Sequence, residues 1–177
     1  MLIIVGPSAA GKTEVVKRLM EISHLKKVVT FTTRSMRWQE VEGIDYHFIS
    51  VEEFKEKLEK NFFFEYVIYN DNYYGTSKND IAPDRVVILE PNGLKQYVER
   101  ASENIKICYL ECEENVREVR MVERKDQAAV IKKRLKSDRI FFNEEIRGMA
   151  DWIVDSQHQS VDEVAQEVLE RYLPYSH

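Results

Sequence analysis

The chain has 177 residues, of which 44% are hydrophobic and 32% are charged, and its formal net charge is −5. This composition predicts one folded domain with a packed core and excludes a disordered chain. The acidic balance argues against a general binder of nucleic acid or anionic membranes, and no apolar run approaches the ~20 residues of a membrane-spanning helix. We therefore expect small-molecule ligands.

The cysteines and the first residues bear on the cellular compartment. Cys108 and Cys112 are four residues apart, and no second pair or nearby histidine completes a metal site. Reduced thiols are therefore expected. The apolar run at residues 1–5 is too short for the core of a signal peptide and lacks a basic leader. These features predict a cytoplasmic protein.

The first elements along the chain are a strand and a helix. Residues 2–5 form an apolar run that meets glycine and proline, which is typical of a buried parallel strand. Residues 13–20 predict a helix with Val15, Val16 and Leu19 on one side. A strand, a glycine turn and a helix open a βαβ unit.

The turn between that strand and helix is a complete G-x-x-x-x-G-K-[ST] motif. Its residues are Gly6, Pro7, Ser8, Ala9, Ala10, Gly11, Lys12 and Thr13. The glycines let the backbone curl so that several N–H groups point at one phosphate, and the helix adds its positive end. In such motifs the lysine reaches the β- and γ-phosphates of ATP and the hydroxyl ligates Mg²⁺. The motif predicts a P-loop nucleotide site.

The segment from residue 28 to about residue 82 is rich in β-branched and aromatic side chains. Strands are predicted there at residues 28–33, 46–49, 62–69 and 73–74. Residues 70–72 predict the turn between the last two strands. Ser50 and Glu53 form a capping box that opens a helix through residue 58. This segment predicts a small α+β lobe.

The alternation of strand and helix returns after residue 82. Strands are predicted at residues 86–89, 105–110 and 152–154, and helices at residues 94–101, 114–122, 128–145 and 161–173. Ser160 and Glu163 form a second capping box at the start of the last helix. The pattern predicts an α/β, three-layer P-loop fold with a parallel core sheet, the inserted lobe and a charged helical arm.

Three further motifs follow the P-loop in a fixed order. Residues 30–37 read T-F-T-T-R-S-M-R, residues 42–48 read E-G-I-D-Y-H-F, and Glu65 precedes N-Y-Y-G-T-S at residues 72–77. This succession resembles the guanylate kinase family, and the resemblance runs from the P-loop to the final strand. It implies a nucleoside monophosphate kinase that transfers the γ-phosphoryl of ATP, with Mg²⁺, to GMP or dGMP.

The resemblance implies one domain over residues 1–177 with three functional parts. The core spans residues 1–29, 83–119 and 136–177, the monophosphate-binding lobe spans residues 30–82, and a lid spans about 120–135. The residues that would hold the acceptor phosphate are Arg34, Arg37, Tyr46 and Tyr74. Those that would face the base are Thr30, Glu65 and Thr76, with Glu65 accepting hydrogen bonds from the guanine N1–H and amine.

The chemistry of these residues is sensible without the family. Two arginines three apart can fork onto a dianionic phosphate, although Arg34 and Arg37 could also be solvated loop cations. The tyrosines could be ordinary strand aromatics that cover the core. A carboxylate suits guanine, whose edge offers two adjacent donors, and Glu65 stands in an apolar run where a carboxylate needs a partner or an exposed position.

Arginines of the charged arm complete the predicted catalytic set. Arg120 and Arg124 are four apart and share a helix face. The resemblance aligns Arg120, Arg124 and Arg134 with lid arginines that close over the ATP phosphates, and it makes Lys12 and Arg34 catalytic as well. The alternative is a solvated basic helix face. The interval from Arg124 to Arg134 is one residue shorter than the family pattern.

The family's D-x-D-x-Q-G pattern after the third core strand is missing. Glu90 runs directly into Pro91, Asn92 and Gly93, so Glu90 stands for the first carboxylate and the second has no clear equivalent. The sequence therefore leaves open which base the acceptor nucleotide carries. A kinase for another (deoxy)nucleoside monophosphate and a non-catalytic guanylate-kinase-like binding module remain as alternatives, and the intact P-loop argues against the module. A signalling GTPase is excluded because its motifs would occur in reverse order.

Overall fold

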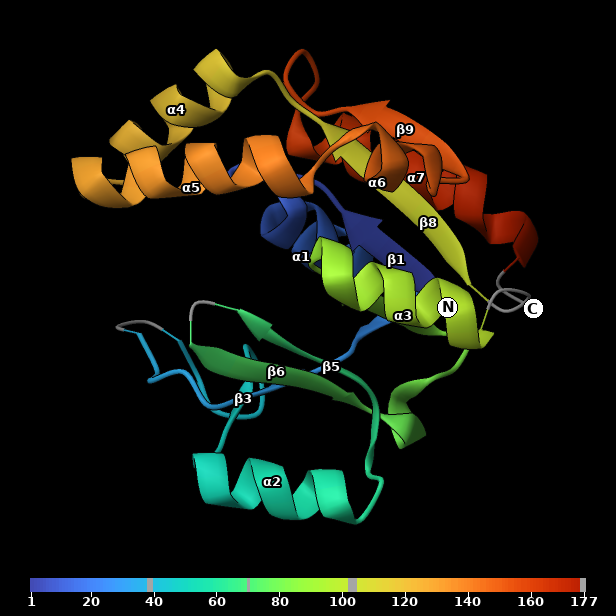
Figure 1. Ribbon diagram of the computed structural model, residues 1–177. Coiled ribbons are helices and arrows are strands. Elements are labelled where there is room, and N and C mark those ends of the chain that lie inside the picture. Colours follow the sequence, from blue (N-terminus) through green and yellow to red (C-terminus); the bar gives the residue numbers. More distant parts are fainter. Residues whose placement is uncertain (38–39, 70, 102–104, 176–177) are drawn as a thin grey trace.

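Two β-sheets organise the molecule in the computed structural model, which describes residues 1–37, 40–69, 71–101 and 105–175. The larger sheet is parallel, with strand order β2-β7-β1-β8-β9. Its strands are β1 (Leu2–Val5), β2 (Lys26–Lys27), β7 (Arg85–Ile88), β8 (Lys106–Glu111) and β9 (Trp152–Asp155). Figure 1 shows this sheet in the upper part of the molecule and the second sheet below it.

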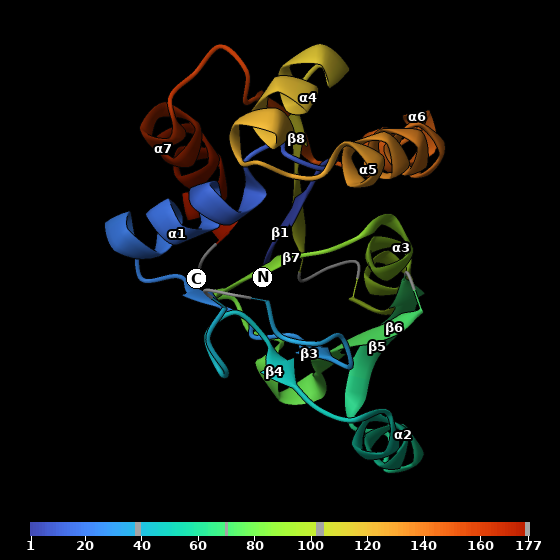
Figure 2. The same cartoon turned by 90° about the vertical axis from the view of Figure 1, so that its left-hand side faces the viewer.

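Helices cover both faces of the parallel sheet. Leu2 and Ile4 of β1 face a layer formed by α1 (Lys12–Ile22) and α7 (Val161–Tyr172). Ile3 and Val5 point the other way, toward α3 (Pro91–Ala101) and α6 (Glu144–Gly148). Figure 2 shows the two pairs of helices on opposite sides of the sheet. This alternation along a fully buried strand produces the predicted three-layer α/β fold.

The second sheet has the strand order β4-β3-β6-β5. Its strands are β3 (Phe31–Thr32), β4 (His47–Phe48), β5 (Phe63–Tyr69) and β6 (Asn72–Ser77). The predicted capping box of Ser50 and Glu53 opens α2 (Val51–Glu59), and Phe54 of this helix stacks on Phe63 with ring centroids 4.3 Å apart. Helix α3 lies between the two sheets (Figure 1), and a short 3₁₀ helix (Lys78–Asp80) follows β6.

A β-bulge in β5 decides which residues face α3. The register with β6 shifts between Phe63 and Glu65, so the intervening Phe64 has no partner across the ladder. Phe63 packs against α2, whereas Phe64 packs against Tyr97 of α3 with centroids 4.7 Å apart. Glu65 also faces α3, near Gly93. The bulge therefore turns two consecutive side chains toward the same helix.

Helices α4 (Glu114–Glu123) and α5 (Ala128–Phe141) form an arm over the P-loop, called here the α4–α5 arm. Met121, Ile131 and Leu135 form a small core of their own within it, and Ala9 of the P-loop packs against that core. Figure 1 shows the arm at the upper left, where it extends away from the parallel sheet. The arm reaches the loop through both apolar and polar contacts.

Two predicted elements were wrong in extent. The predicted strand at residues 28–33 is not continuous. Val28 follows the end of β2 and its N still bonds Val86 O (2.8 Å), whereas Phe31 belongs to β3 in the second sheet and pairs with Gly75. The predicted helix at residues 128–145 breaks after Phe141, because the Asn143 side chain accepts from Ile146 N (3.1 Å) and starts a new helix.

The remaining differences are small. Strand β6 is longer than predicted, and Asn70 of the predicted turn lies outside the described residues. The final helix ends at Tyr172 and continues as a 3₁₀ turn (Leu173–Tyr175). Within the described ranges, no helix combines the length and the apolar character needed to cross a membrane.

Candidate active site

The P-loop joins β1 to α1 and has the backbone geometry that its glycines predict. Gly6 has φ +155°, and a Cβ there would lie 2.6 Å from the carbonyl oxygen of Leu110, so a side chain cannot fit. Gly11 has φ +89° and precedes the first residue of the helix. The Lys12 ammonium spans the loop by donating to Gly6 O (2.5 Å) and Pro7 O (2.9 Å). Thr13 stands exposed in the first helical turn.

Glu90 lies at the carboxyl end of the central strands, beside the P-loop. Burial raises the pKa of its carboxyl, Lys12 opposes this, and Asp138 of α5 adds to it. Burial also lowers the pKa of Lys12, which Glu90 opposes. Among the described residues, the Glu90 carboxylate accepts no hydrogen bond, so its oxygens remain available to a ligand. Together with the Thr13 hydroxyl, these oxygens are the hard donors that Mg²⁺ prefers, and the residues therefore fit the ion.

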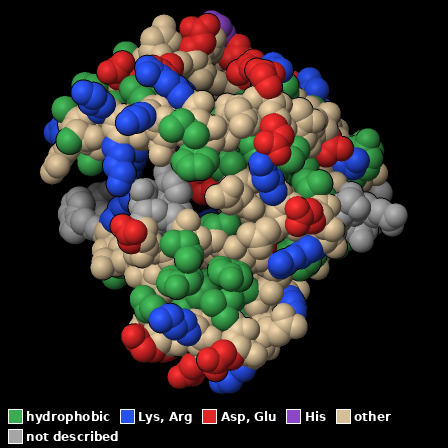
Figure 3. All heavy atoms as spheres, in the orientation of Figure 1, with side chains coloured by type: hydrophobic (Ala, Val, Ile, Leu, Met, Phe, Trp, Pro, Cys, Tyr) green, Lys and Arg blue, Asp and Glu red, His purple; other side chains and the backbone are tan. Residues whose placement is uncertain are grey.

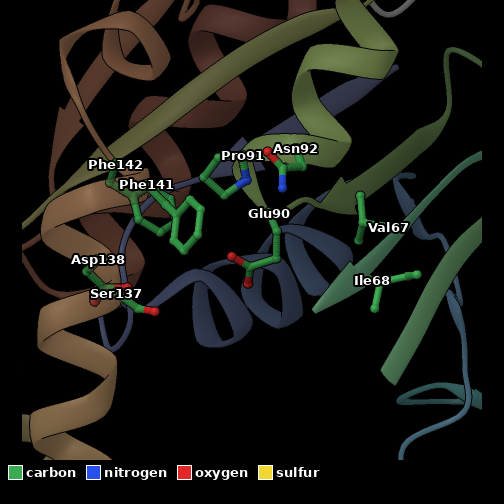
Figure 4. Close-up of a pocket in the computed structure, with 9 residues that line it drawn as sticks. All are labelled: Val67, Ile68, Glu90, Pro91, Asn92, Ser137, Asp138, Phe141 and Phe142. Carbon is green, nitrogen blue, oxygen red and sulfur yellow. The ribbon is translucent and has the colours of Figure 1, made fainter. Parts of the chain in front are cut away.

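A pocket of about 200 Å³ opens around Glu90. Its lining comes from β5, the start of α3 and the end of α5: Val67, Ile68, Glu90, Pro91, Asn92, Ser137, Asp138, Phe141 and Phe142. Figure 4 shows Glu90 at the centre, with its carboxylate directed away from Asn92 and Val67. Figure 3 shows the same region as a hollow between the α4–α5 arm above and the second sheet below. The pocket thus lies between the two sheets.

The predicted acceptor-phosphate residues gather on the second sheet. The Arg34 guanidinium lies over the rings of Tyr46 and Phe48, at 5.3 and 5.7 Å from their centroids. The Tyr46 ring is 6.1 Å from that of Tyr74 in an edge-on contact. Burial raises the pKa of Tyr46, with smaller contributions from Tyr74 and, across the cleft, from Glu90. Arg34, Tyr46 and Tyr74 are therefore neighbours.

Glu40 is a partner of Arg34 that the sequence analysis missed. The two form a bidentate ion pair, with distances of 3.0 and 2.7 Å, and Glu40 also accepts from Arg37 N (2.7 Å). The Arg37 side chain is exposed. The only available signal was a glutamate three residues after an R-x-x-R pair, which does not by itself indicate a partner. Glu40 holds Arg34 in place against the aromatic rings.

The predicted base-reading residues lie at the interface of β5, β6 and α3. Thr76 Oγ1 donates to Glu65 Oε1 (2.8 Å), and both residues are buried, at 0% and 2% exposed. Burial raises the pKa of Glu65 to about 7, although Thr76 and Arg100 oppose the shift. A Cβ on Gly93 would lie 3.3 Å from Glu65 Oε2, so helix α3 closes against this carboxylate.

Thr30, the third predicted base-reading residue, lies where the chain passes from one sheet to the other. It is half-buried between β2 and β3, and its carbonyl accepts from His47 N (3.0 Å). Tyr97, which the sequence analysis did not single out, is fully buried in α3. The pKa of Tyr97 is raised, first by burial and also by Glu65.

The three arm arginines are placed differently from one another. Arg120 donates to Ala9 O of the P-loop (3.2 Å) and to Ser156 O (2.7 Å). Arg124 and Arg134 both pair with Asp126, at 3.5 and 2.7 Å. The structure therefore brings Arg120 to the phosphate loop and holds the other two on a shared carboxylate.

Two buried charges at the loop were also missed. Arg117 of α4 and Asp138 of α5 form an ion pair of 2.7 Å, and Asp138 accepts from both the backbone N and the hydroxyl of Ser8. A charged residue within an amphipathic charged helix gives no signal of burial. The sequence analysis singled out neither residue.

Comparisons with known proteins agree with this arrangement. A guanylate kinase from Clostridioides difficile is 32% identical over 194 residues, an alignment that covers 97% of this chain and 95% of the relative. One from Prochlorococcus marinus is 33% identical, covering 96% and 94%. The crystal structure of guanylate kinase from Anaplasma phagocytophilum superposes with a TM-score of 0.77 at 18% identity, over 99% of this chain and 85% of that one, which supports the fold.

The family assignment rests on nearly the whole chain. The sequence model described as guanylate kinase matches residues 1–172, from the first strand through the last helix. The match therefore includes the P-loop, the second sheet, the α4–α5 arm and the shortened segment after Glu90. The chain belongs to the guanylate kinase family.

Proposed function

We propose that this protein transfers the γ-phosphoryl group of ATP to GMP, giving ADP and GDP. Membership of the guanylate kinase family supports the reaction. The observation that supports guanine as the base is the buried Glu65 carboxylate, which Thr76 orients and Gly93 adjoins. An ionised carboxylate accepts from the two adjacent donors of guanine, whereas adenine presents an acceptor at that edge.

The residues divide between the two substrates. Gly6 to Thr13 would bind the ATP phosphates through backbone N–H groups and Lys12, whose ammonium leaves the loop carbonyls to meet them. Arg34, Arg37, Tyr46 and Tyr74 would bind the acceptor phosphate, and Thr30, Glu65 and Thr76 its base. Tyrosine hydroxyls suit a phosphate site because they donate without adding charge. The pocket around Glu90 is lined by residues of β5, the start of α3 and the end of α5.

The transfer itself needs no general base, because the attacking phosphate oxygen is already anionic. Catalysis is then positioning and neutralisation of charge on the transferring group. We assign the neutralising role to Lys12, Arg34, Arg120, Arg124 and Arg134. Arg124 and Arg134 reach that group when the lid over residues 120–135 closes and their contacts with Asp126 exchange for phosphate. Closure also excludes water.

Mg²⁺ is the proposed ion of the reaction, held by Thr13 and by Glu90 or waters on it. When bound, it neutralises charge on the β- and γ-phosphates. The protein side of this site is the half-buried Glu90 carboxylate, which accepts no hydrogen bond among the described residues and is near enough to Lys12 for the two charges to interact. Glu90 thereby takes the place of the first carboxylate in the family's pattern.

We also propose which regions of the chain serve this activity, where in the cell the protein acts, and which class of ligand it binds. Residues 30–82 would form the monophosphate-binding lobe, and residues 1–29, 83–119 and 136–177 the core. A cytoplasmic location fits the two buried free thiols, Cys108 and Cys112, because cytoplasmic thiols stay reduced. Nucleotides rather than nucleic acid fit a net charge of −5.

An acceptor panel tests the proposal. ATP consumption in a coupled assay is compared for GMP, dGMP, AMP, CMP, UMP and dTMP, with the wild type and Glu65→Gln. The expected result is turnover on GMP that the substitution weakens through KM, because an amide offers one acceptor and one donor where guanine needs two acceptors. Preferred turnover on a base other than guanine would keep the phosphate chemistry and overturn the role of Glu65.

A further inference from the structure

Arg117 and Asp138 form an ion pair in which both partners are almost completely removed from solvent. Each residue is 5% exposed, and Arg117 Nη1 lies 2.7 Å from Asp138 Oδ2. Taking two charges out of water carries a large desolvation penalty, so such a pair is often no more stabilising than an apolar pair of similar volume. A contribution to stability alone therefore does not explain it.

Both charges converge on Ser8, in the middle of the P-loop. Asp138 accepts from Ser8 N (3.0 Å) and from Ser8 Oγ (3.1 Å). Arg117 donates to Ser8 O (3.4 Å) and, through Nε, to Cys112 O (3.1 Å). One residue of the loop is thus bound at its amide, its hydroxyl and its carbonyl by side chains from the two helices of the α4–α5 arm.

The next residue is held in a conformation that needs support. Ala9 has φ +61°, in the left-handed region, which is strained for a residue with a Cβ. Its carbonyl accepts from Arg120 (3.2 Å), and its side chain packs on Met121, Ile131 and Leu135. All of these contacts come from the α4–α5 arm, so the arm stabilises the strained part of the loop.

The pair also leaves the local charge near zero. Burial lowers the pKa of Lys12, whereas Asp138 raises it and Arg117 lowers it further. The two charges therefore act on the phosphate-binding ammonium with opposite sign. Asp138 can bind the loop amide without presenting a net negative charge to an incoming phosphate.

We propose that Arg117 and Asp138 are positioning residues that hold Ser8 and Ala9 in the anion-binding conformation of the P-loop, and so set the affinity for the nucleotide diphosphate moiety. This proposal rests on the proposed function in one respect: it takes the ligand of the P-loop to be ATP or ADP. Neither residue needs to touch the nucleotide. The proposed acceptor site on the second sheet is not part of this arrangement, so binding of the acceptor should not depend on the Arg117–Asp138 pair.

The test is the affinity for ADP and for GMP, measured separately by isothermal titration calorimetry on the full chain. In Asp138→Asn, we expect the ADP Kd to rise about ten- to a hundredfold, as for the loss of a charged hydrogen-bonding group, with the GMP Kd unchanged. Adding Ala9→Gly should lower the ADP Kd again, because glycine adopts positive φ without cost. An unchanged ADP Kd, or equal losses for both ligands, would overturn the proposal.

Two further variants separate positioning from folding. Arg117→Met with Asp138→Leu replaces the pair by apolar side chains of similar volume, which keeps the interior neutral. We expect it to unfold as cooperatively as the wild type and still to bind ADP weakly; wild-type ADP affinity would contradict the proposal. If this variant does not fold, the ADP Kd of Asp138→Asn is compared with that of the double variant Asp138→Asn, Ala9→Gly. A lower Kd in the double variant supports the proposal, and an equal Kd contradicts it.

Asp151→Asn is the matched control. Asp151 accepts from Lys106 Nζ (3.0 Å) and Ile107 N (2.8 Å), so it also joins a cation to a backbone N–H, but at the start of β8 and β9. Its ADP Kd should match the wild type. The measured quantity is binding and not turnover, so the two proposals can fail separately. A wild type that binds ADP but not GMP would refute GMP as the acceptor. The effect of Asp138→Asn on the ADP Kd would still show whether the Arg117–Asp138 pair positions the P-loop.

Discussion

The Thr76 hydroxyl donates a 2.8 Å hydrogen bond to the Glu65 carboxylate across the β5–β6 ladder, in a place that water does not reach. Burial raises the pKa of Glu65 to about 7, and the Thr76 bond limits the shift. A carboxylate poised in this way changes its charge within the physiological pH range. Substrate recognition and stability should therefore both depend on the same ionisation.

The affinity for GMP should increase with pH. Only ionised Glu65 accepts from both guanine donors, and with a pKa of about 7 its ionised fraction rises about tenfold from pH 6 to pH 8. The KM for GMP should fall by a similar factor. The GMP phosphate also titrates near pH ~6, so Glu65→Gln serves as the control that retains only that titration. Equal pH profiles for the two proteins would show that Glu65 does not read the base.

Stability should change with pH in the opposite direction. Because the folded-state pKa of Glu65 lies above the model-peptide value of 4.5, the folded protein binds more protons between about pH 4.5 and pH 7, and stability falls as pH rises through that window. Glu65→Gln cannot ionise, so it should exceed the wild type at pH 8 by up to roughly 3 kcal/mol.

Urea unfolding at about pH 4 and pH 8 measures this effect. The advantage of the Gln variant should shrink toward zero at the lower pH, where the wild-type carboxyl is largely protonated in both states. A Gln variant that is less stable than the wild type by the same amount at both pH values would mean that packing, not ionisation, governs this position.

Gly93→Ala should weaken GMP binding selectively. The new Cβ would lie 3.3 Å from Glu65 Oε2 and 3.7 Å from Leu89 Cδ2, so the carboxylate must shift by a few tenths of an ångström. We expect a rise of a few-fold to tenfold in the KM for GMP, with the KM for ATP unchanged. Gly148→Ala is the control, because a Cβ there meets nothing within 4 Å. Equal effects of the two substitutions would refute the prediction.

Lys12→Ala should remove most of the turnover. The Lys12 ammonium bridges Gly6 O and Pro7 O at the loop, from which it can swing to a phosphate. Loss of a cation that meets developing charge typically lowers kcat by about 10² to 10³. Lys17→Ala removes an exposed lysine of the same helix that pairs with Glu14, and it should keep the wild-type rate. Similar rates for both variants would show that the loop does not serve catalysis.

The parts predicted from the sequence are those in which the relevant residues are close along the chain. The P-loop occupies eight consecutive residues, and its turn, glycines and lysine could be interpreted together. The two capping boxes are equally local, and both form as expected at Ser50 and Ser160. Strand and helix alternation then predicted the layers, because a parallel sheet buries both of its faces.

The parts that could not be predicted depend on distant partners. Ser8 and Asp138 are 130 residues apart, and only the folded arm brings them together. The bulge at Phe64 turns Glu65 toward α3, yet β5 has the composition of a regular strand. The run at residues 28–33 crosses between two sheets without any break in its pattern of β-branched and aromatic side chains. Tertiary contacts decide these features, and the pattern of residue types along the chain does not reveal them.

The most direct measurement is the identity of the products. The protein is incubated with ATP, Mg²⁺ and GMP, and the nucleotides are separated by ion-exchange chromatography over time. The account predicts that ADP and GDP appear in equal amounts, that neither forms without GMP, and that Lys12→Ala forms neither at a comparable rate. ADP without GDP, or bound nucleotides with no product, would contradict the transfer of a phosphoryl group to GMP.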